Sequence, residues 1–136
     1  MINILIVDDY KPFLEEACRV IGNDGTLIST ARTSKDAIRQ IQEQRFDLVI
    51  TDLFMESHTA EDGLSVLRAA KRSEFAQVIV VTSFGKPELS EASMRLGAFD
   101  YIERGSPGTD FRFMLESKTR LALDYRDAKV KVSNRS

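Results

Sequence analysis

Short runs of apolar residues, many of them β-branched, alternate along the chain with longer stretches in which apolar residues recur every three or four positions. The runs are Ile2–Val7, Thr26–Thr30, Phe46–Thr51, Val78–Thr82 and Phe99–Glu103. Continuous apolar runs, rather than strict alternation of apolar and polar residues, are typical of strands that are buried on both faces. We therefore predict five strands, of which Thr26–Thr30 has the weakest pattern.

The stretches between these runs predict helices, because their apolar residues fall on one face of a helix. The helices are expected to begin near Pro12, Ser34, Gly63, Pro87 and Pro107. Proline suits the first turn of a helix, where its missing N–H would have no partner, and serine can cap a helix. Gly97 is the expected C-cap of the fourth helix, and the fifth is expected to end near Ala128.

Five strands that alternate with five helices predict a parallel sheet with right-handed crossovers. The natural arrangement is an α/β, flavodoxin-like, doubly wound sheet with the strand order 2-1-3-4-5. We expect one domain over residues 1–128, with 129–136 as a C-terminal tail or the start of a linker. The ligand crevice of such a sheet lies at the carboxyl ends of the first and third strands, where the strand order reverses.

Several polar side chains follow directly after the predicted strands. Asp8 and Asp9 follow the first strand, and Asp52 follows the third. Thr82 ends the fourth strand, and Arg104 follows the fifth. Carboxylates that lie close together repel one another and raise their pKa values unless a cation sits among them. Mg²⁺ is the expected cation, since it takes carboxylates, waters and phosphate oxygens as ligands, and a carboxylate can also be the nucleophile that forms an aspartyl-phosphate.

Composition narrows the classes of function. The chain has 136 residues and a net charge of −2, which argues against a direct nucleic-acid or membrane-surface binder. Cys18 is the only cysteine, so an internal disulfide is excluded and a reducing, cytoplasmic location is expected. The first residues lack the features of a signal peptide, and no apolar run approaches the length of a membrane span.

Five segments of the chain can be compared with known families. They are Ile4–Asp9, Asp47–Asp52, Asp62–Leu64, Val80–Ser83 and Gly97–Ile102. In this order they resemble the signature blocks of bacterial two-component response-regulator receiver domains. The resemblance implies a module of phosphorelay signal transduction that assists its own phosphorylation and dephosphorylation but is not an enzyme in the usual sense.

The resemblance also implies roles for single residues. Asp52 would be the phosphoacceptor, supplied by a histidine kinase or a phosphotransfer protein. Asp9 and Asp52 would bind Mg²⁺ directly, Asp8 would assist through a water molecule, and the backbone carbonyl of Phe54 would be a further ligand.

A switch is implied as well. Thr82 would hydrogen-bond a phosphoryl oxygen and Tyr101 would turn inward. The surface of the fourth helix, fifth strand and fifth helix, about Phe84 to Leu115, would then change its preference for a partner. That partner would be a downstream protein, a fused effector domain or a second copy of the chain.

The sequence departs from the family pattern after the fifth strand and after Asp52. Arg104-Gly105 stands where the family has Lys-Pro, so the positive charge is kept and a proline that often forms a cis bond is lost. Arg104 either contacts the phosphoryl group or points to solvent. Glu56 replaces a usual proline in a loop about three residues longer than the common pattern, and His58 in that loop either tunes the pocket or is solvated.

Two aromatic residues, Phe54 and Phe84, stand two positions after Asp52 and Thr82. In the family these positions influence the access of water to the aspartyl-phosphate, so bulky apolar groups predict a long-lived phosphorylated state. The alternative is that both only cover the rim of the pocket or contact a partner.

Three other functions compete with the switched receiver. The strongest is a pseudo-receiver, a protein-interaction module of the same fold that works without phosphorylation. A phosphatase or phosphotransferase for small molecules would need a second acid two residues after the nucleophile, where Phe54 stands. A nucleotide-binding flavodoxin-like protein would need a Gly-rich phosphate loop after a strand, and the sequence has none.

Overall fold

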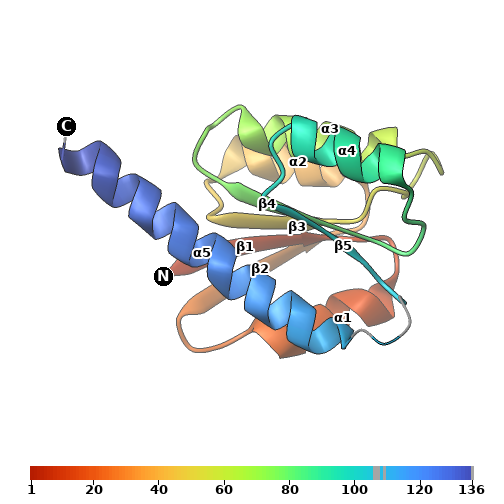
Figure 1. Ribbon diagram of the computed structural model, residues 1–136, viewed down its shortest axis with the longest axis horizontal. Helices are drawn as coiled ribbons and strands as arrows, with labels where there is room; N and C mark the ends of the chain where they lie inside the picture. Colours follow the sequence, from red (N-terminus) through yellow and green to blue (C-terminus); the bar gives the residue numbers. More distant parts are fainter. Residues whose placement is uncertain (106–107, 109, 136) are drawn as a thin grey trace.

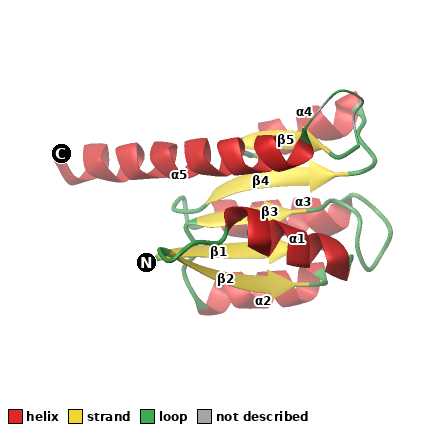
Figure 2. Ribbon diagram, turned by 90° about the horizontal axis from the view of Figure 1, so that it is seen from below, coloured by secondary structure: helices red, strands yellow, loops and turns green. Residues whose placement is uncertain are grey.

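The sheet of this protein has five parallel strands in the order β2-β1-β3-β4-β5, so the predicted strand order is confirmed. We describe a computed structural model that covers residues 1–105, 108 and 110–135. The strands are β1 (Ile2–Val7), β2 (Thr26–Ala31), β3 (Leu48–Thr51), β4 (Gln77–Thr82) and β5 (Asp100–Glu103). All five carboxyl ends lie at one edge of the sheet (Figure 2).

Five helices cover the two faces of the sheet in the described part of the chain (Figure 1). They are α1 (Lys11–Ile21), α2 (Ser34–Glu43), α3 (Glu61–Lys71), α4 (Pro87–Arg95) and α5 (Phe111–Arg135). Helices α1 and α5 lie on one face, and α2, α3 and α4 lie on the other.

Each face of the sheet contributes to a separate apolar core. Leu5 and Val7 of β1 pack on the side of α2 and α3, whereas Ile4 and Ile6 pack on the side of α1 and α5. Successive side chains of a strand point to opposite faces, and all four of these side chains are fully buried. Both faces are therefore covered, which explains why the strand is apolar throughout rather than alternating.

The predicted start of α2 at Ser34 is confirmed, but the residue predicted to cap it is wrong. Thr33, not Ser34, caps α2, because its side chain accepts a hydrogen bond from the backbone N–H of Asp36 at 3.1 Å. Helix α3 begins at Glu61 rather than Gly63. The predicted start of the last helix at Pro107 lies outside the described residues.

Helix α5 continues to Arg135, so its predicted end near Ala128 is wrong. It passes well beyond the edge of the sheet (Figure 1). Although α5 has 25 residues, neither it nor another described helix is long and apolar enough to cross a membrane.

A stack of charged and aromatic side chains fixes the distal half of α5 to the body of the domain. The guanidinium groups of Arg45 and Arg126 lie 3.3 and 3.8 Å from the centroid of the Phe75 ring. Arg126 of α5 also pairs with Asp47 at 2.8 Å. Cation–π contacts contribute about 0.5–1 kcal/mol each, and the ion pair is largely buried, so these contacts hold α5 against the domain where its apolar pattern has faded.

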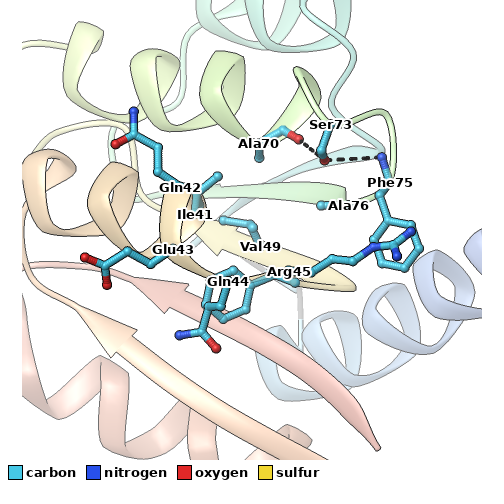
Figure 3. Close-up of a pocket in the computed structure, with 11 residues that line it drawn as sticks. Ile41, Gln42, Glu43, Gln44, Arg45, Val49, Ala70, Ser73, Phe75 and Ala76 are labelled. Carbon is cyan, nitrogen blue, oxygen red and sulfur yellow. Dashed lines mark hydrogen bonds between the residues drawn. The ribbon is translucent and has the colours of Figure 1, made fainter.

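A cavity of about 400 Å³ opens beside this stack, at the amino ends of β3 and β4 (Figure 3). Ile41, Val49 and Ala76 form apolar walls, and Arg45 and Phe75 lie at its rim. Because the strands are parallel, this cavity is at the opposite end of the sheet from the aspartates that follow β1 and β3. We therefore place the candidate site at the other end.

Candidate functional site

Three aspartates meet at the carboxyl ends of β1 and β3. One carboxylate oxygen from each of Asp8, Asp9 and Asp52 lies within 4.8 Å of the others. The backbone N–H of Asp52 donates to the carbonyl of Val7 at 2.9 Å, so strand pairing extends to the aspartate itself. Asp8 is fully buried, Asp52 is 8% exposed and Asp9 is exposed. The cluster is thus open to solvent at Asp9, and the predicted convergence is present.

Burial makes ionisation of this cluster costly. Burial raises the pKa of Asp8 to about 6, and the carboxylates of Asp52 and Asp9 add to the rise. The backbone N–H of Tyr10, 2.9 Å from Asp8 Oδ1, works in the opposite direction. Burial also raises the pKa of Asp52, against the N–H of Leu53, which donates to its Oδ1 at 2.7 Å. Oxygen donors with this excess of negative charge fit a divalent cation such as Mg²⁺.

The backbone of α3 packs directly on the peptide of Asp52. A Cβ atom at Gly63 would lie 2.1 Å from the carbonyl oxygen of Asp52, too close for any side chain. The N–H of Gly63 donates to the carbonyl of Leu53 at 2.9 Å. Glycine is therefore required here, and the close approach fixes the strand end that carries the aspartate.

Thr82 and Tyr101 border the pocket on the side of β4 and β5. Thr82 is fully buried, and its hydroxyl accepts a hydrogen bond from the N–H of Phe84 at 3.2 Å. The Tyr101 ring packs against the core, and its hydroxyl is buried without a hydrogen-bond partner among the described residues. Burial raises the pKa of Tyr101. A cavity of about 310 Å³ is lined by this residue and by Pro87 at the start of α4.

Arg104 points into the site and not to solvent. Its Nη2 atom lies 3.4 Å from Oδ2 of Asp8, and its side chain is 19% exposed. The guanidinium carbon lies 4.3 Å from the centroid of the Phe13 ring on α1. Gly105 follows with a left-handed φ of 80°. The arginine therefore contacts the side of the pocket that carries Asp8, a placement that the sequence left open.

Glu56 has a role that sequence reasoning missed. Its Oε1 accepts from the N–H of Ser34 at 2.9 Å, and its Oε2 accepts from the N–H of Lys35 at 3.4 Å. These are free N–H groups of the first turn of α2, where a negative charge is stabilising. The loop after β3 is thus tied to α2 by the residue that replaces the usual proline. The sequence holds no signal for a contact between these positions.

Asp62 organises the same loop from within. One of its carboxylate oxygens accepts from the N–H groups of Met55 at 2.8 Å and Ser57 at 3.0 Å. His58 is exposed and has a left-handed φ of 59°. The longer loop is therefore ordered by internal hydrogen bonds, and its histidine is solvated.

Phe54 and Phe84 form an aromatic pair beside the pocket. Their ring centroids are 5.8 Å apart and the rings are nearly perpendicular, at 82°. Phe84 is 68% exposed. An exposed aromatic edge-to-face pair joins the loops that follow β3 and β4, which carry Asp52 and Thr82.

Comparison with known proteins establishes the family. A family model described as the response regulator receiver domain matches residues 4–113. The chain therefore belongs to the response-regulator receiver domain family, whose members are signalling domains of two-component systems rather than classical enzymes.

Its relatives include two named regulators. An NtrX-like response regulator of Rickettsia bellii is 26% identical over 140 residues, which cover 100% of this chain and 29% of that protein. The photosynthetic apparatus regulatory protein RegA of Cereibacter sphaeroides is 25% identical over 116 residues, covering 85% of this chain and 62% of that protein. The chain thus spans less than two thirds of the length of either relative.

Solved structures share the fold. A CheY-like receiver domain protein from Methanospirillum hungatei matches with a TM-score of 0.82 and 24% identity, over 95% of this chain and 98% of that chain. NtrX from Brucella abortus, in complex with ADP, matches with a TM-score of 0.84 and 25% identity, over 100% of this chain and 30% of that chain.

Replacement of Asp8 should stabilise the metal-free protein at neutral pH. Because its folded pKa of about 6 lies above the ordinary value of 3.8, the stability of the folded state falls as pH rises between these values. We expect Asp8→Asn to raise the free energy of unfolding at pH 7 by about 2 kcal/mol, with the difference vanishing in acid below the ordinary carboxyl pKa. Urea unfolding in EDTA from pH 3 to 8 measures this, with the exposed Asp24→Asn as control. A variant that is less stable than the wild type at pH 7 would contradict it.

Replacement of Glu56 should destabilise α2. Burial of Glu56 acts to raise its pKa, but hydrogen bonds from Ser34 and Lys35 hold that pKa below its ordinary value of 4.5. The stabilisation is therefore present above pH 4.5 and is lost as pH falls through the lower folded pKa. We expect Glu56→Ala to cost about 1 kcal/mol at pH 7 and to speed amide exchange in the first turn of α2.

The control is Glu15→Ala, an exposed glutamate in the middle of α1. An equal loss of stability in both variants, or a loss at Glu56 that persists unchanged at pH 3, would show that the loop does not cap α2.

Proposed function

We propose that this chain is a phosphorylation-switched receiver whose Asp52 accepts a phosphoryl group from a histidine kinase or a phosphotransfer protein in the cytoplasm. The observation that supports this most directly is the cluster of three aspartate carboxylates within 4.8 Å of one another, at the switch point of the sheet. Asp52 is the member that combines burial, a position at the end of β3 and access from solvent. In the transfer, a carboxylate oxygen of Asp52 attacks phosphorus, the P–N bond to the donor histidine breaks, and that nitrogen keeps the electron pair.

The aspartate cluster fits a divalent cation in its donor atoms. In this proposal Asp9, Asp52 and the Phe54 carbonyl hold Mg²⁺, and Asp8 assists through a water molecule. Bound Mg²⁺ supplies positive charge that offsets the charge of the phosphoryl oxygens. Asp8, buried and only partly compensated, supplies the negative charge that draws a cation to the cluster.

The switch of the proposal uses Thr82 and Tyr101. The Thr82 hydroxyl accepts from the N–H of Phe84 and would donate its own proton to a phosphoryl oxygen. The cavity between Tyr101 and the start of α4 provides space for α4 to shift. Phosphate would thereby bias two states of the α4–β5–α5 surface by its contacts in one of them.

That surface is where we place the downstream partner. The NtrX-like relatives are more than three times as long as this chain, which covers 29% of one of them. A fused effector domain, a separate protein or a second copy of the chain bound through α4, β5 and α5 is each compatible with this output.

A pseudo-receiver remains the second candidate, and a specific observation favours it. Arg104 stands where the family has lysine, and it pairs with Asp8 at 3.4 Å on the metal side. In a protein-interaction module that is never phosphorylated, Arg104 could stay paired with Asp8 without loss of function.

Incubation with Mg²⁺ and a small phosphodonor such as acetyl phosphate tests the proposal. We expect intact-mass spectrometry to show a gain of one phosphoryl group in the wild type and none in Asp52→Asn. Beryllofluoride with Mg²⁺ should shift the amide resonances of β4, α4 and β5 in the wild type alone.

The absence of both effects in a folded wild-type protein would favour the pseudo-receiver. A phosphoryl group that is still gained by Asp52→Asn would place the acceptor elsewhere. Asp24→Asn, an exposed loop variant with the same change of charge, controls for the substitution itself.

The aromatic pair should prolong the phosphorylated state. With Phe84 packed edge-to-face on Phe54, water reaches the phosphoryl group of Asp52 less readily. We expect Phe84→Ala to shorten the half-life of the aspartyl-phosphate several-fold, as measured by the decay of the phosphorylated mass. Phe113→Ala, which removes a similarly exposed ring from α5, should leave the half-life unchanged. An equal half-life in Phe84→Ala and wild type would mean that the pair serves partner contact instead.

A further inference from the structure

Arg104, which stands where the family has lysine, pairs with an aspartate of the cluster. Its side chain extends from the end of β5 to the aspartate that follows β1, where Nη2 lies 3.4 Å from Oδ2 of Asp8. The Asp8 side chain is 1% exposed. A pair so far from water is screened weakly, so its strength is greater than that of a surface ion pair.

The aromatic ring of Phe13 holds the guanidinium in this position. The guanidinium carbon lies 4.3 Å from the ring centroid, and Phe13 is itself 4% exposed. A planar guanidinium can stack on a ring and pair with a carboxylate at the same time, whereas a lysine ammonium is a compact point charge. Gly105, with a φ of 80° and no atom near its virtual Cβ, allows the backbone turn that follows.

The pairing leaves the guanidinium incompletely bonded. Nε of Arg104 is buried and has no hydrogen-bond partner among the described residues. The contact to Asp8 is a single long hydrogen bond of 3.4 Å rather than a bidentate pair. The resting position is therefore one that the arginine can leave for a better set of acceptors.

We infer that Arg104 is an internal counter-cation that competes with a divalent metal ion for Asp8 and must leave this carboxylate when the metal binds. The inference rests on the proposed metal site of the receiver and adds a property specific to this chain. A cation held by Asp9 and Asp52, with Asp8 assisting through a water molecule, would face a guanidinium of the same sign of charge on Asp8 and would compete with it for that carboxylate. Once released from Asp8, Arg104 remains beside Phe13, where it can turn its free donors toward phosphoryl oxygens on Asp52.

Two consequences follow for the order of events. Metal binding is weaker than the aspartate cluster alone would allow, because the arginine must first be displaced. Phosphorylation offsets this cost, since phosphoryl oxygens give the displaced guanidinium new acceptors. Metal and phosphate should therefore bind more cooperatively here than in a variant without the arginine.

Isothermal titration with Mg²⁺ alone, on the whole chain, tests the competition. Arg104→Met keeps an apolar stem against Phe13 and removes the charge. We expect it to bind Mg²⁺ at least about tenfold more tightly than the wild type, the effect of one opposing charge near a partly buried site. Arg104→Lys should lie between the two, and Arg120→Met, the same change on an exposed face of α5, should match the wild type.

A second measurement uses the wild type and so does not depend on the folding of a variant. Rotation of the Arg104 guanidinium about its Nε–Cζ bond, followed by NMR, should become faster as Mg²⁺ saturates the site, because the Asp8 pair is broken. The guanidinium of Arg126, held between Asp47 and Phe75, should not change.

The outcomes separate the two proposals. Equal affinities in wild type and Arg104→Met, or an Arg104 rotation that does not respond to saturating Mg²⁺, overturn the competition while leaving the metal site intact. No Mg²⁺ binding in any folded variant removes the metal site of the proposed function, and the competition with it.

Discussion

Mutual repulsion among neighbouring carboxylates, two of them buried, is the constraint on which this domain is organised. Three aspartates share a few ångström at the ends of β1 and β3, and one of them is fully buried with a pKa of about 6. Such an arrangement is unfavourable without a cation. Three groups near the cluster each offset part of that negative charge. They are the N–H of Tyr10, the N–H of Leu53 and the guanidinium of Arg104. Because these groups neutralise only part of the negative charge, the charge that remains favours the binding of a metal ion.

The two ends of the sheet divide stability and function between them. At the amino ends, the Phe75 ring is stacked between Arg45 and Arg126, and ion pairing with Asp47 fixes α5. At the carboxyl ends, buried polar groups such as the Tyr101 hydroxyl and Arg104 Nε lack partners among the described residues. The first end fixes α5 to the body of the domain, although Arg126 Nε and Gln77 Nε2 there are also buried without partners among the described residues. At the second end the polar groups without partners belong to residues that border the aspartate cluster, where a ligand could bind them.

The sequence allowed the sheet and the aspartate cluster to be predicted, because apolar runs place the strand ends and parallel strands bring those ends together. Asp8, Asp9 and Asp52 follow directly from that geometry. The partner of Arg104 did not, since its contact with Asp8 joins residues 96 positions apart and depends on a side-chain rotamer and on Phe13. The Glu56 contact with α2 could not be predicted for the same reason, because it joins a loop to the first turn of a helix 22 positions earlier in the chain. The end of α5 was missed because Arg126 and Phe75, rather than an apolar stripe, hold it.

The anchored, projecting α5 has a geometric consequence. Arg126 is fixed to the body of the domain, and the helix runs on to Arg135, a further rise of about 14 Å at 1.5 Å per residue. Each residue of a helix that continues from such an anchor has a fixed orientation about the helix axis relative to the domain. One residue inserted after Arg126 would turn everything beyond it by about 100°, whereas seven would nearly restore the original direction. The direction in which a surface on such a continuation faces therefore depends on the number of residues between it and Arg126, as does its distance from the domain.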